Sequence, residues 1–445
     1  MSISTTTDTT SARSEAGSAT APLGAVRRRY GVRAAWIMVA SGWSANQFSA
    51  LLGAYRSELG LVESAVTGLF ALYVVGLIPG LLVGGPLADR VGRRPVALAA
   101  LALNLLSTGV LMLGAGATGW LWPGRFVTGV SAGALLAAGS AWIKELSSRE
   151  GASATTASRR AGLFVSAGFA SGGLVAALIA RWAPEPMVVA YVPHVLLAAG
   201  AGLAALKAPE SMAAPAVGRR SARRVGSPLL ERSRELGEGW AQPTMPSTDQ
   251  RGIATRFRRA VLPVAPWVFA APSIGFVTLP GLVHGGLVHA GVATAVVPGT
   301  GLLVQPLARR LAPRHRLATA VAGLLIIAAG FTAAAFAAAT GGQALALAAA
   351  AVLGAGYGFV LTHGLTEITA MAPPHRLARL TAYFWTAAYA GMFAPYAVTL
   401  LSSTAHPATL LAAAAALAAL SCALLLALDR RPAAAASPVS PNGRP

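Results

Sequence analysis

The stretch "GGPLADRVGRRP" (residues 84–95) places one acid, Asp89, among three arginines, Arg90, Arg93 and Arg94. The run before it, "VTGLFALYVVGLIPGLLV" (66–83), contains no charged residue. An uncharged run that gives way to a dense group of charges is typical of a transmembrane helix that ends at the membrane surface.

The composition supports a membrane protein. Of the 445 residues, 55% are hydrophobic and 11% are charged, whereas soluble proteins carry about 25% charged residues. The runs are apolar on all faces rather than alternating, so they predict helices and not a barrel. Since a span needs roughly 20 apolar residues, we expect an all-α membrane protein with twelve helices, near 34–55, 66–86, 95–115, 121–143, 161–180, 187–206, 261–282, 285–306, 317–338, 344–365, 380–401 and 408–428.

The basic residues predict the orientation. The formal net charge is +20, yet all but three of the 35 basic residues fall in the tails, the central linker and the loops of one side. The exceptions are Arg56 and Arg181 in loops of the other side and Arg125 within a span. Cytoplasmic loops carry such an excess, so we expect a multi-pass protein of the cytoplasmic membrane with both termini inside. The charge then indicates contact with anionic lipid headgroups and no nucleic-acid binding.

A linker divides the spans into six and six. We expect bundles at 27–206 and 259–429, joined by a cytoplasmic linker at 207–258 that is rich in Arg, Ser and Pro. Within it, 227–240 is either a short interfacial helix or disordered. The tails 1–26 and 430–445 are expected to be disordered, and the first lacks the apolar segment of a signal peptide. The single cysteine, Cys422, excludes an internal disulfide.

The two halves resemble each other in sequence. A shift of 220 residues places "PLADRVGRRPVAL" (86–98) on "PLARRLAPRHRLA" (306–318), with Asp89 matched by Arg309. The same shift places Arg159 on Arg379. This register predicts duplication of a six-helix unit, an architecture of transporters.

Residues 85–94 resemble the Gly-x-Leu-Ala-Asp-Arg-x-Gly-Arg-Arg signature of the major facilitator superfamily, which lies between its second and third helices. The resemblance extends over about 27–430 and implies two six-helix repeats around a central cavity. "RFVTGVSAG" (125–133) resembles the family's Arg-x-x-x-Gly pattern at Arg125 and Gly129. "GFASGG" (168–173) resembles the antiporter motif of the fifth helix, with Phe169 where that motif has proline. We expect its glycines and Gly129 to pack helices closely; they are Gly168, Gly172 and Gly173.

The resemblance implies that the signature latches the cytoplasmic side shut when the cavity faces outward. Asp89 is expected to pair with Arg93 and to meet the positive N-terminal end of the eleventh helix. The alternative is that Arg90 and Arg94 only set the topology. The predicted latch comprises Gly85, Asp89, Arg90, Gly92, Arg93, Arg94 and Glu145.

Charged residues inside a span are costly and indicate function. Arg125 either lines the cavity or reaches outer headgroups. Candidates for proton or substrate coupling are Arg125, Glu58 and His194. In the family, the first, fourth, seventh and tenth helices line the cavity, and the eleventh is aromatic here, although aromatics also pack helices. The predicted cavity residues are Trp43, Asn46, Gln47, Ser273, Thr278, Tyr357, Thr362, Trp385 and Tyr389.

No enzyme, metal, cofactor or nucleotide motif appears in the sequence. We therefore predict a secondary active transporter, a monomer whose partners are a small molecule, protons and lipids. The first hypothesis is proton-coupled efflux of an amphipathic compound. The alternatives are an uptake permease for a sugar or organic acid and a membrane sensor or scaffold that does not transport.

Overall fold

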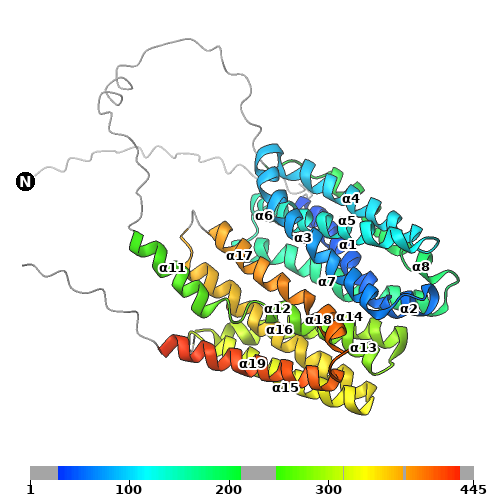
Figure 1. Ribbon diagram of the computed structural model, residues 1–445. Coiled ribbons are helices and arrows are strands. Elements are labelled where there is room, and N and C mark those ends of the chain that lie inside the picture. Colours follow the sequence, from blue (N-terminus) through cyan, green and yellow to red (C-terminus); the bar gives the residue numbers. More distant parts are fainter. Residues whose placement is uncertain (1–28, 212–246, 314, 374–376, 431–445) are drawn as a thin grey trace, which may run out of the picture.

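The structure is a computed structural model that describes residues 29–211, 247–313, 315–373 and 377–430. Over these residues the chain is helical and forms no strand. The helices lie alongside one another in an elongated bundle, with α1–α9 on one side and α11–α19 on the other (Figure 1). The predicted interfacial helix at 227–240 lies outside the described residues.

The first group of helices, the N half, begins at α1 and ends at α9. One continuous helical segment starts with η1, includes α5 and a π-helical turn at η2, and ends with α6. The bounds are α1 Tyr30–Ala50, α2 Leu52–Leu59, α3 Glu63–Val91, α4 Arg93–Leu113, η1 Thr118–Trp120, α5 Leu121–Ala134, η2 Leu135–Gly139, α6 Ser140–Arg149, α7 Ala154–Trp182, α8 Pro186–Val189 and α9 Val192–Leu206.

The second group, the C half, begins with a basic helix, α11, which starts within the predicted linker and ends two residues after it. A second π-helical turn, η3, follows α12. The bounds are α11 Ser247–Ala260, α12 Trp267–Ser273, η3 Ile274–Thr278, α13 Leu279–Leu282, α14 Gly286–Leu311, α15 Ala318–Thr340, α16 Gln343–Met371, α17 Leu377–Ala390, η5 Gly391–Phe393, α18 Ala394–Leu401 and α19 Pro407–Arg430.

Nine helical segments of the described ranges are long and apolar enough to cross a bilayer. The other three predicted spans fall on α1 with α2, on α12–α13 and on α17–α18. The sequence of α1 carries Ser41, Ser44, Asn46, Gln47 and Ser49, which lower its hydropathy. The second contains Trp267–Leu282, an apolar helical segment that is shorter than the nine, and in the third η5 lies between α17 and α18. Twelve crossings therefore stay a prediction.

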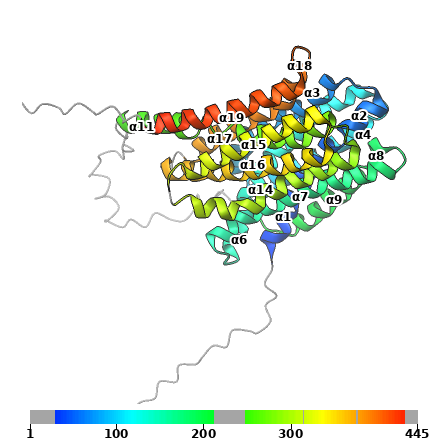
Figure 2. The same ribbon diagram turned by 90° about the horizontal axis from the view of Figure 1, so that it is seen from below.

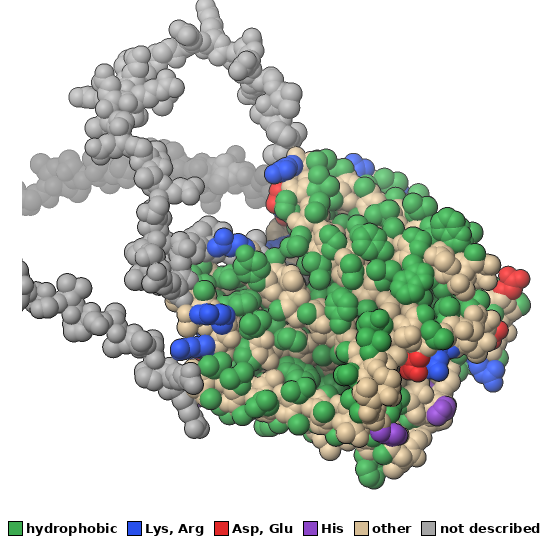
Figure 3. All heavy atoms as spheres, viewed as in Figure 1, with side chains coloured by type: hydrophobic (Ala, Val, Ile, Leu, Met, Phe, Trp, Pro, Cys, Tyr) green, Lys and Arg blue, Asp and Glu red, His purple; other side chains and the backbone are tan. Residues whose placement is uncertain are grey.

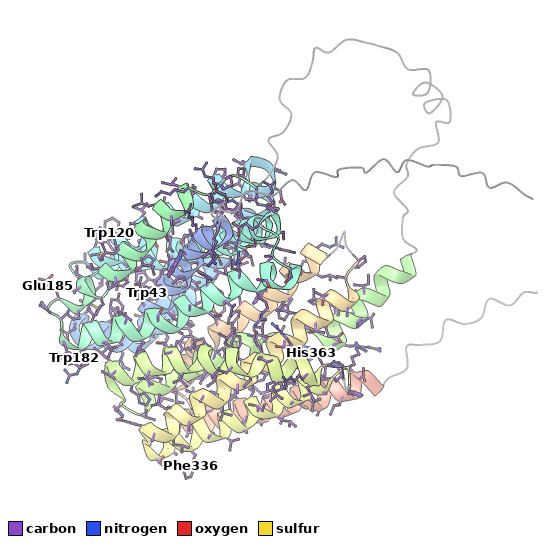
Figure 4. The ribbon with its side chains drawn as sticks, turned by 180° about the vertical axis from the view of Figure 1, so that it is seen from behind. Trp43, Trp120, Trp182, Glu185, Phe336 and His363 are labelled. Atoms are coloured by element: carbon purple, nitrogen blue, oxygen red, sulfur yellow. The ribbon has the colours of Figure 1, made fainter. Side chains whose placement is uncertain are left out.

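The bundle has two ends, which we name by a residue at each. The Arg93 end carries α6, α11 and the last residues of α19, and the Glu185 end carries α2 and α8; both views show this arrangement (Figures 1 and 2). Figure 3 shows basic side chains along the Arg93 end and apolar side chains over the flank of the bundle. Figure 4 labels Trp182 and Glu185 together at the other end.

Glycines bring helices into backbone contact in both halves. A Cβ atom on Gly129 of α5 would lie 2.0 Å from the Tyr73 carbonyl oxygen of α3. A Cβ atom on Gly76 of α3 would lie 2.1 Å from the Phe126 carbonyl oxygen of α5. In the C half, Cβ atoms on Gly354 and Gly358 of α16 would lie 2.3 Å from carbonyl oxygens of α14. Small residues allow such close approach of transmembrane helices. The pairs α3–α5 and α14–α16 thus pack alike.

Candidate functional site

A cavity of about 560 Å³ lies between the two halves. Its lining comes from α1, α3, η2, α6 and α7 on one side and from α12, η3, α14, α16, α17 and η5 on the other. Both π-helical turns contribute to it, through Leu136 and Phe276. Such turns occur frequently at functional sites, whereas the apolar runs of the sequence predict regular helices at both segments.

Five of the nine predicted cavity residues line this cavity: Asn46, Ser273, Tyr357, Trp385 and Tyr389. The other four are not part of its lining: Trp43, Gln47, Thr278 and Thr362. The structure therefore corrects their predicted position, although each is on a helix that borders the cavity.

Helix geometry explains the correction in α1. Asn46 faces α7, and its Nδ2 donates a hydrogen bond to the Phe169 carbonyl oxygen at 2.9 Å. Gln47 is one residue further along, about 100° around the helix, and is fully buried. Trp43 is partly buried and its backbone lies against α7, where a Cβ on Gly172 would lie 2.7 Å from the Trp43 Cα (Figure 4). In α16, the Thr362 hydroxyl donates to the Gly358 carbonyl oxygen of its own helix.

Aromatic side chains form the C-half wall of the cavity. The rings of Phe269 and Tyr389 stack with centroids 4.6 Å apart and planes inclined by 10°. Trp385 stacks on Tyr389 at 5.8 Å, and Tyr357 lies 6.3 Å from Phe269. Phe269 of α12 was not predicted, since a single phenylalanine in an apolar helix looks like any packing residue.

The cavity opens at the Arg93 end. Arg159 of α7 and Arg309 of α14 line it there, and both are exposed. Toward the Glu185 end the halves touch, with Phe70 and Phe276 in edge-to-face contact at 6.1 Å. Beyond them, a Cβ on Gly68 would lie 3.6 Å from the Tyr396 ring. We name this contact region the closed end.

The predicted latch residues surround Arg93. The guanidinium of Arg93 pairs with Asp89 at 2.6 Å and with Glu145 at 3.3 Å. The Asp89 side chain is 60% exposed, and Arg93 is its one ion-pair partner in the described chain. Residues 374–376, which precede α17 (the eleventh predicted span), lie outside the described chain, so the contact between Asp89 and the N-terminal end of that helix stays a prediction.

Gly92 has a φ of +118°, so the turn between α3 and α4 favours glycine. A Cβ there would also lie 2.6 Å from the Glu210 carboxylate. Gly85 lies inside α3, where a Cβ would meet only the Ala137 side chain at 3.8 Å. Arg90 is exposed, and Arg94 donates to the Leu206 carbonyl oxygen at 2.9 Å.

Sequence reasoning missed Glu210, which follows α9 at the start of the predicted linker. Its carboxylate accepts hydrogen bonds from the backbone N–H groups of Arg93 (3.2 Å) and Arg94 (2.9 Å). It thereby caps the positive N-terminal end of α4. Ser211 donates to Glu145 and accepts from Arg149, so residues 210–211 bind the latch segment to the end of α6.

The C half carries a related charge cluster, which we name the Glu367 cluster. Glu367 of α16 is only 6% exposed and pairs with Arg256 of α11 and Arg316, each at 3.3 Å. Arg316 also pairs with Asp429 at 3.4 Å. A shift of 222 residues places Arg94 and Glu145 on Arg316 and Glu367. That comparison was the signal in the sequence that could have identified this cluster.

Arg125 is fully buried between α1, α3 and α5. Its guanidinium carbon lies 4.2 Å from the Phe48 ring centroid and 4.8 Å from that of Tyr73. Nε donates to the Leu69 carbonyl oxygen at 3.3 Å, while Nη1 and Nη2 have no hydrogen-bond partner in the described chain. Arg125 therefore neither lines the cavity nor reaches headgroups here. It lies behind Tyr73, whose side chain is part of the cavity lining.

His194 belongs to a buried polar network inside the N half. Asn104 Nδ2 donates to the hydroxyls of Ser44 (3.0 Å) and Ser131 (2.9 Å). The Asn104 Oδ1 therefore accepts from His194 Nε2 at 3.1 Å, and Thr108 lies 2.9 Å from Nδ1. The network joins α1, α4, α5 and α9 and does not touch the cavity.

The third coupling candidate, Glu58, is exposed at the end of α2, away from the cavity.

The glycines of α7 face two helices. Gly168 and Gly172 pack on α1, since a Cβ on Gly168 would lie 2.1 Å from the Val39 carbonyl oxygen. Gly173 instead faces Thr294 of α14, with a Cβ position 2.1 Å from its hydroxyl. One short segment thus packs against its own half and against the other half. In the part of the chain that the structure describes, no group of three His, Cys, Asp or Glu side chains could hold a metal ion.

Comparisons with known proteins agree with this fold. Solved structures that are similar include a D-xylose–proton symporter, with 17% identity, a TM-score of 0.66 and coverage of 89% of this chain and 96% of that one. A POT family transporter in complex with 5-aminolevulinic acid has 12% identity, a TM-score of 0.69 and coverage of 90% and 95%. The nucleoside transporter NupG has 12% identity, a TM-score of 0.64 and coverage of 92% and 100%.

At these identities the likeness shows the fold. No curated protein sequence matches the chain. The family model of the Major Facilitator Superfamily matches residues 32–395, which include the signature segment, the Arg125 segment and every residue of the cavity lining. The chain is therefore an integral membrane protein that belongs to the Major Facilitator Superfamily.

Proposed function

We propose that the protein is a secondary active transporter that moves a small amphipathic molecule by alternating access. The observation that carries this proposal is the cavity between the halves, open at the Arg93 end and closed at the Glu185 end. A rocking motion of the two halves would close the first end and open the second. Twelve crossings and two six-helix repeats are part of the proposal, and the similar packing of α3–α5 and α14–α16 supports them.

The direction that we propose is efflux. The cavity faces the end that we assign to the cytoplasm, and its aromatic wall suits an amphipathic compound. The close packing of Gly168 and Gly172 on α1 would limit leakage along α7 in the closed state.

For coupling we propose proton exchange, with His194 as the titrating group. In the neutral ring, Nε2–H donates to Asn104 and Nδ1 accepts from the Thr108 hydroxyl. In the protonated ring, Nδ1–H would donate to Thr108, whose own hydrogen would turn to the Asn104 carbonyl oxygen at 3.2 Å. Both ring nitrogens would have hydrogen-bond partners in either state, and we propose that protonation alters the packing of α9 on α1 and α4 rather than touching the substrate.

The experiment is transport by purified protein in proteoliposomes with an imposed pH gradient. We expect substrate to move opposite to protons, and His194→Asn to bind substrate while losing the response to the gradient. Movement in the same direction as protons would replace efflux by uptake. Absence of flux for every compound that binds would favour a sensor or scaffold.

We further propose that the Arg93 end is cytoplasmic, with both termini on that side. Single cysteines at positions 56, 230 and 312, with Cys422 replaced, can be treated in intact cells with a membrane-impermeant thiol reagent. Position 56 is at the Glu185 end and should be labelled, whereas 230 in the linker and 312 after α14 should be protected until the cells are opened. Strong labelling at 230 in intact cells would contradict this orientation.

A further inference from the structure

The cavity carries positive charge and no negative charge. Of the described residues that line it, the charged ones are Arg159 and Arg309, and no aspartate or glutamate takes part. Arg125 adds a third cation, buried behind Tyr73 and without a carboxylate partner in the described chain. A cleft lined by one sign of charge within low-dielectric walls raises the local concentration of the opposite charge.

Nearby acids do not neutralise the two arginines at the opening. At the Arg93 end, Asp89 and Glu145 pair with Arg93, and Glu150 pairs with Arg160. Glu367 and Asp429 pair with Arg316. In the described chain Arg159 has no ion pair, and the guanidinium of Arg309 lies 3.5 Å from the neutral amide of Gln305. In the described chain these five acids thus pair with arginines other than these two, and the Glu210 carboxylate accepts from the backbone N–H groups of Arg93 and Arg94.

The sequence comparison of the halves gives the origin of this charge. The position that holds Asp89 in the N half holds Arg309 in the C half. Asp89 is not among the lining residues, whereas Arg309 faces the cavity from α14. The C half therefore places the Arg309 guanidinium at the cavity opening, whereas the corresponding residue of the N half, Asp89, pairs with Arg93 in the latch.

The wall beyond the opening is aromatic. Phe269 and Tyr389 are nearly parallel, with Trp385 stacked on Tyr389. Flat rings of this kind offer a planar apolar group an offset-stacked or edge-on position.

We propose that the substrate is an organic anion with an aromatic ring. The ring packs on the wall formed by Phe269, Trp385 and Tyr389, and the negative group faces Arg159 and Arg309. Cationic amphipathic compounds are excluded by repulsion. This inference rests on the proposed function, since the cavity is the same, and it names the chemical class that the cavity accepts.

The test uses three probes with one ring system and different charge: 2-naphthoate, 2-naphthamide and 2-naphthylmethylammonium. Titration calorimetry on the purified full-length protein at low salt should show 2-naphthoate binding about tenfold or more tightly than the amide, with no binding of the cation. The preference for the carboxylate should weaken as salt is raised, because exposed charges are screened.

The variant Arg159→Gln/Arg309→Gln should bind 2-naphthoate and 2-naphthamide equally, with affinity for the amide retained. Arg310→Gln is the matched control, since Arg310 is exposed and next to Arg309 but is not part of the lining, and it should keep the preference. The proposal is overturned if the cation binds as tightly as the anion, if none of the three probes binds, or if the double variant keeps the preference for the carboxylate.

Flux in proteoliposomes separates this inference from the proposed function. Preference for 2-naphthoate in binding without flux of any probe would contradict transport and support the charge selectivity. Flux of the cationic probe in preference to 2-naphthoate would support transport and overturn the inference.

Discussion

Asp89→Asn should lower the rate of transport by about tenfold or more, the effect of roughly 1.4 kcal/mol on a conformational equilibrium or barrier. Thermal stability should change little. The Asp89 side chain is 60% exposed and pairs with Arg93 within its own half, and exposed pairs contribute about 0–1 kcal/mol to stability. The expected loss comes from the other conformation, in which we propose that the Asp89 carboxylate meets the N-terminal end of α17 as the Arg93 end closes.

Asparagine keeps the shape of the side chain and removes the charge, so packing should survive. Asp429→Asn is the matched control, because Asp429 also forms a half-exposed ion pair at the same end, with Arg316. We expect the control to transport at a near-normal rate. The measurements are the initial rate in proteoliposomes at equal protein content and the melting temperature. Equal transport rates for Asp89→Asn and the unmodified protein would contradict the latch. The charges of the signature segment would then only set the membrane topology.

Most of the membrane helices were predictable because each one requires a long run of apolar residues, which is visible in the sequence. A bilayer of fixed thickness requires long apolar runs, and 66–86 and 95–115 correspond to α3 and α4 within a few residues. Local irregularities were not predictable. The π-helical turns at η2 and η3 and the break at η5 depend on contacts with neighbouring helices, and the residues 274–278 look like any apolar segment. The helix α11 was likewise not predicted, because its segment was assigned to the linker. The ion pair between Arg256 and Glu367 joins α11 to α16.

The candidate site was predictable where a motif specifies local geometry. Asp89 and Arg93 are four residues apart on either side of the turn at Gly92, and so short a connection keeps the carboxylate and the guanidinium close enough to pair. Membership of the cavity lining was harder to predict, because it depends on rotation about each helix axis. Asn46 and Gln47 are adjacent amides of one helix, yet only Asn46 lines the cavity. The position of Arg125 behind Tyr73 depends on three helices at once, and no pattern within α5 records it.

Linking the two halves across the cavity opening should stop transport completely, the largest effect that we expect. Gly162 of α7 and Gln305 of α14 both line the cavity on opposite halves, and a Cβ on Gly162 would meet no atom within 4 Å. Cysteines at both positions, with Cys422 replaced, can be joined by a bifunctional methanethiosulfonate reagent and released by a reductant. Each single-cysteine variant, treated in the same way, controls for the attached reagent.

Alternating access requires the distance between these two positions to change in every transport cycle. The direct measurement is therefore the transport rate of the Gly162→Cys/Gln305→Cys protein before linking, after linking and after reduction. The account predicts normal flux before, no flux while the link is present and recovery after reduction, with both single variants active throughout. Flux that continues at the full rate in fully linked protein would show that the halves do not move against each other at this opening, and would contradict transport by alternating access.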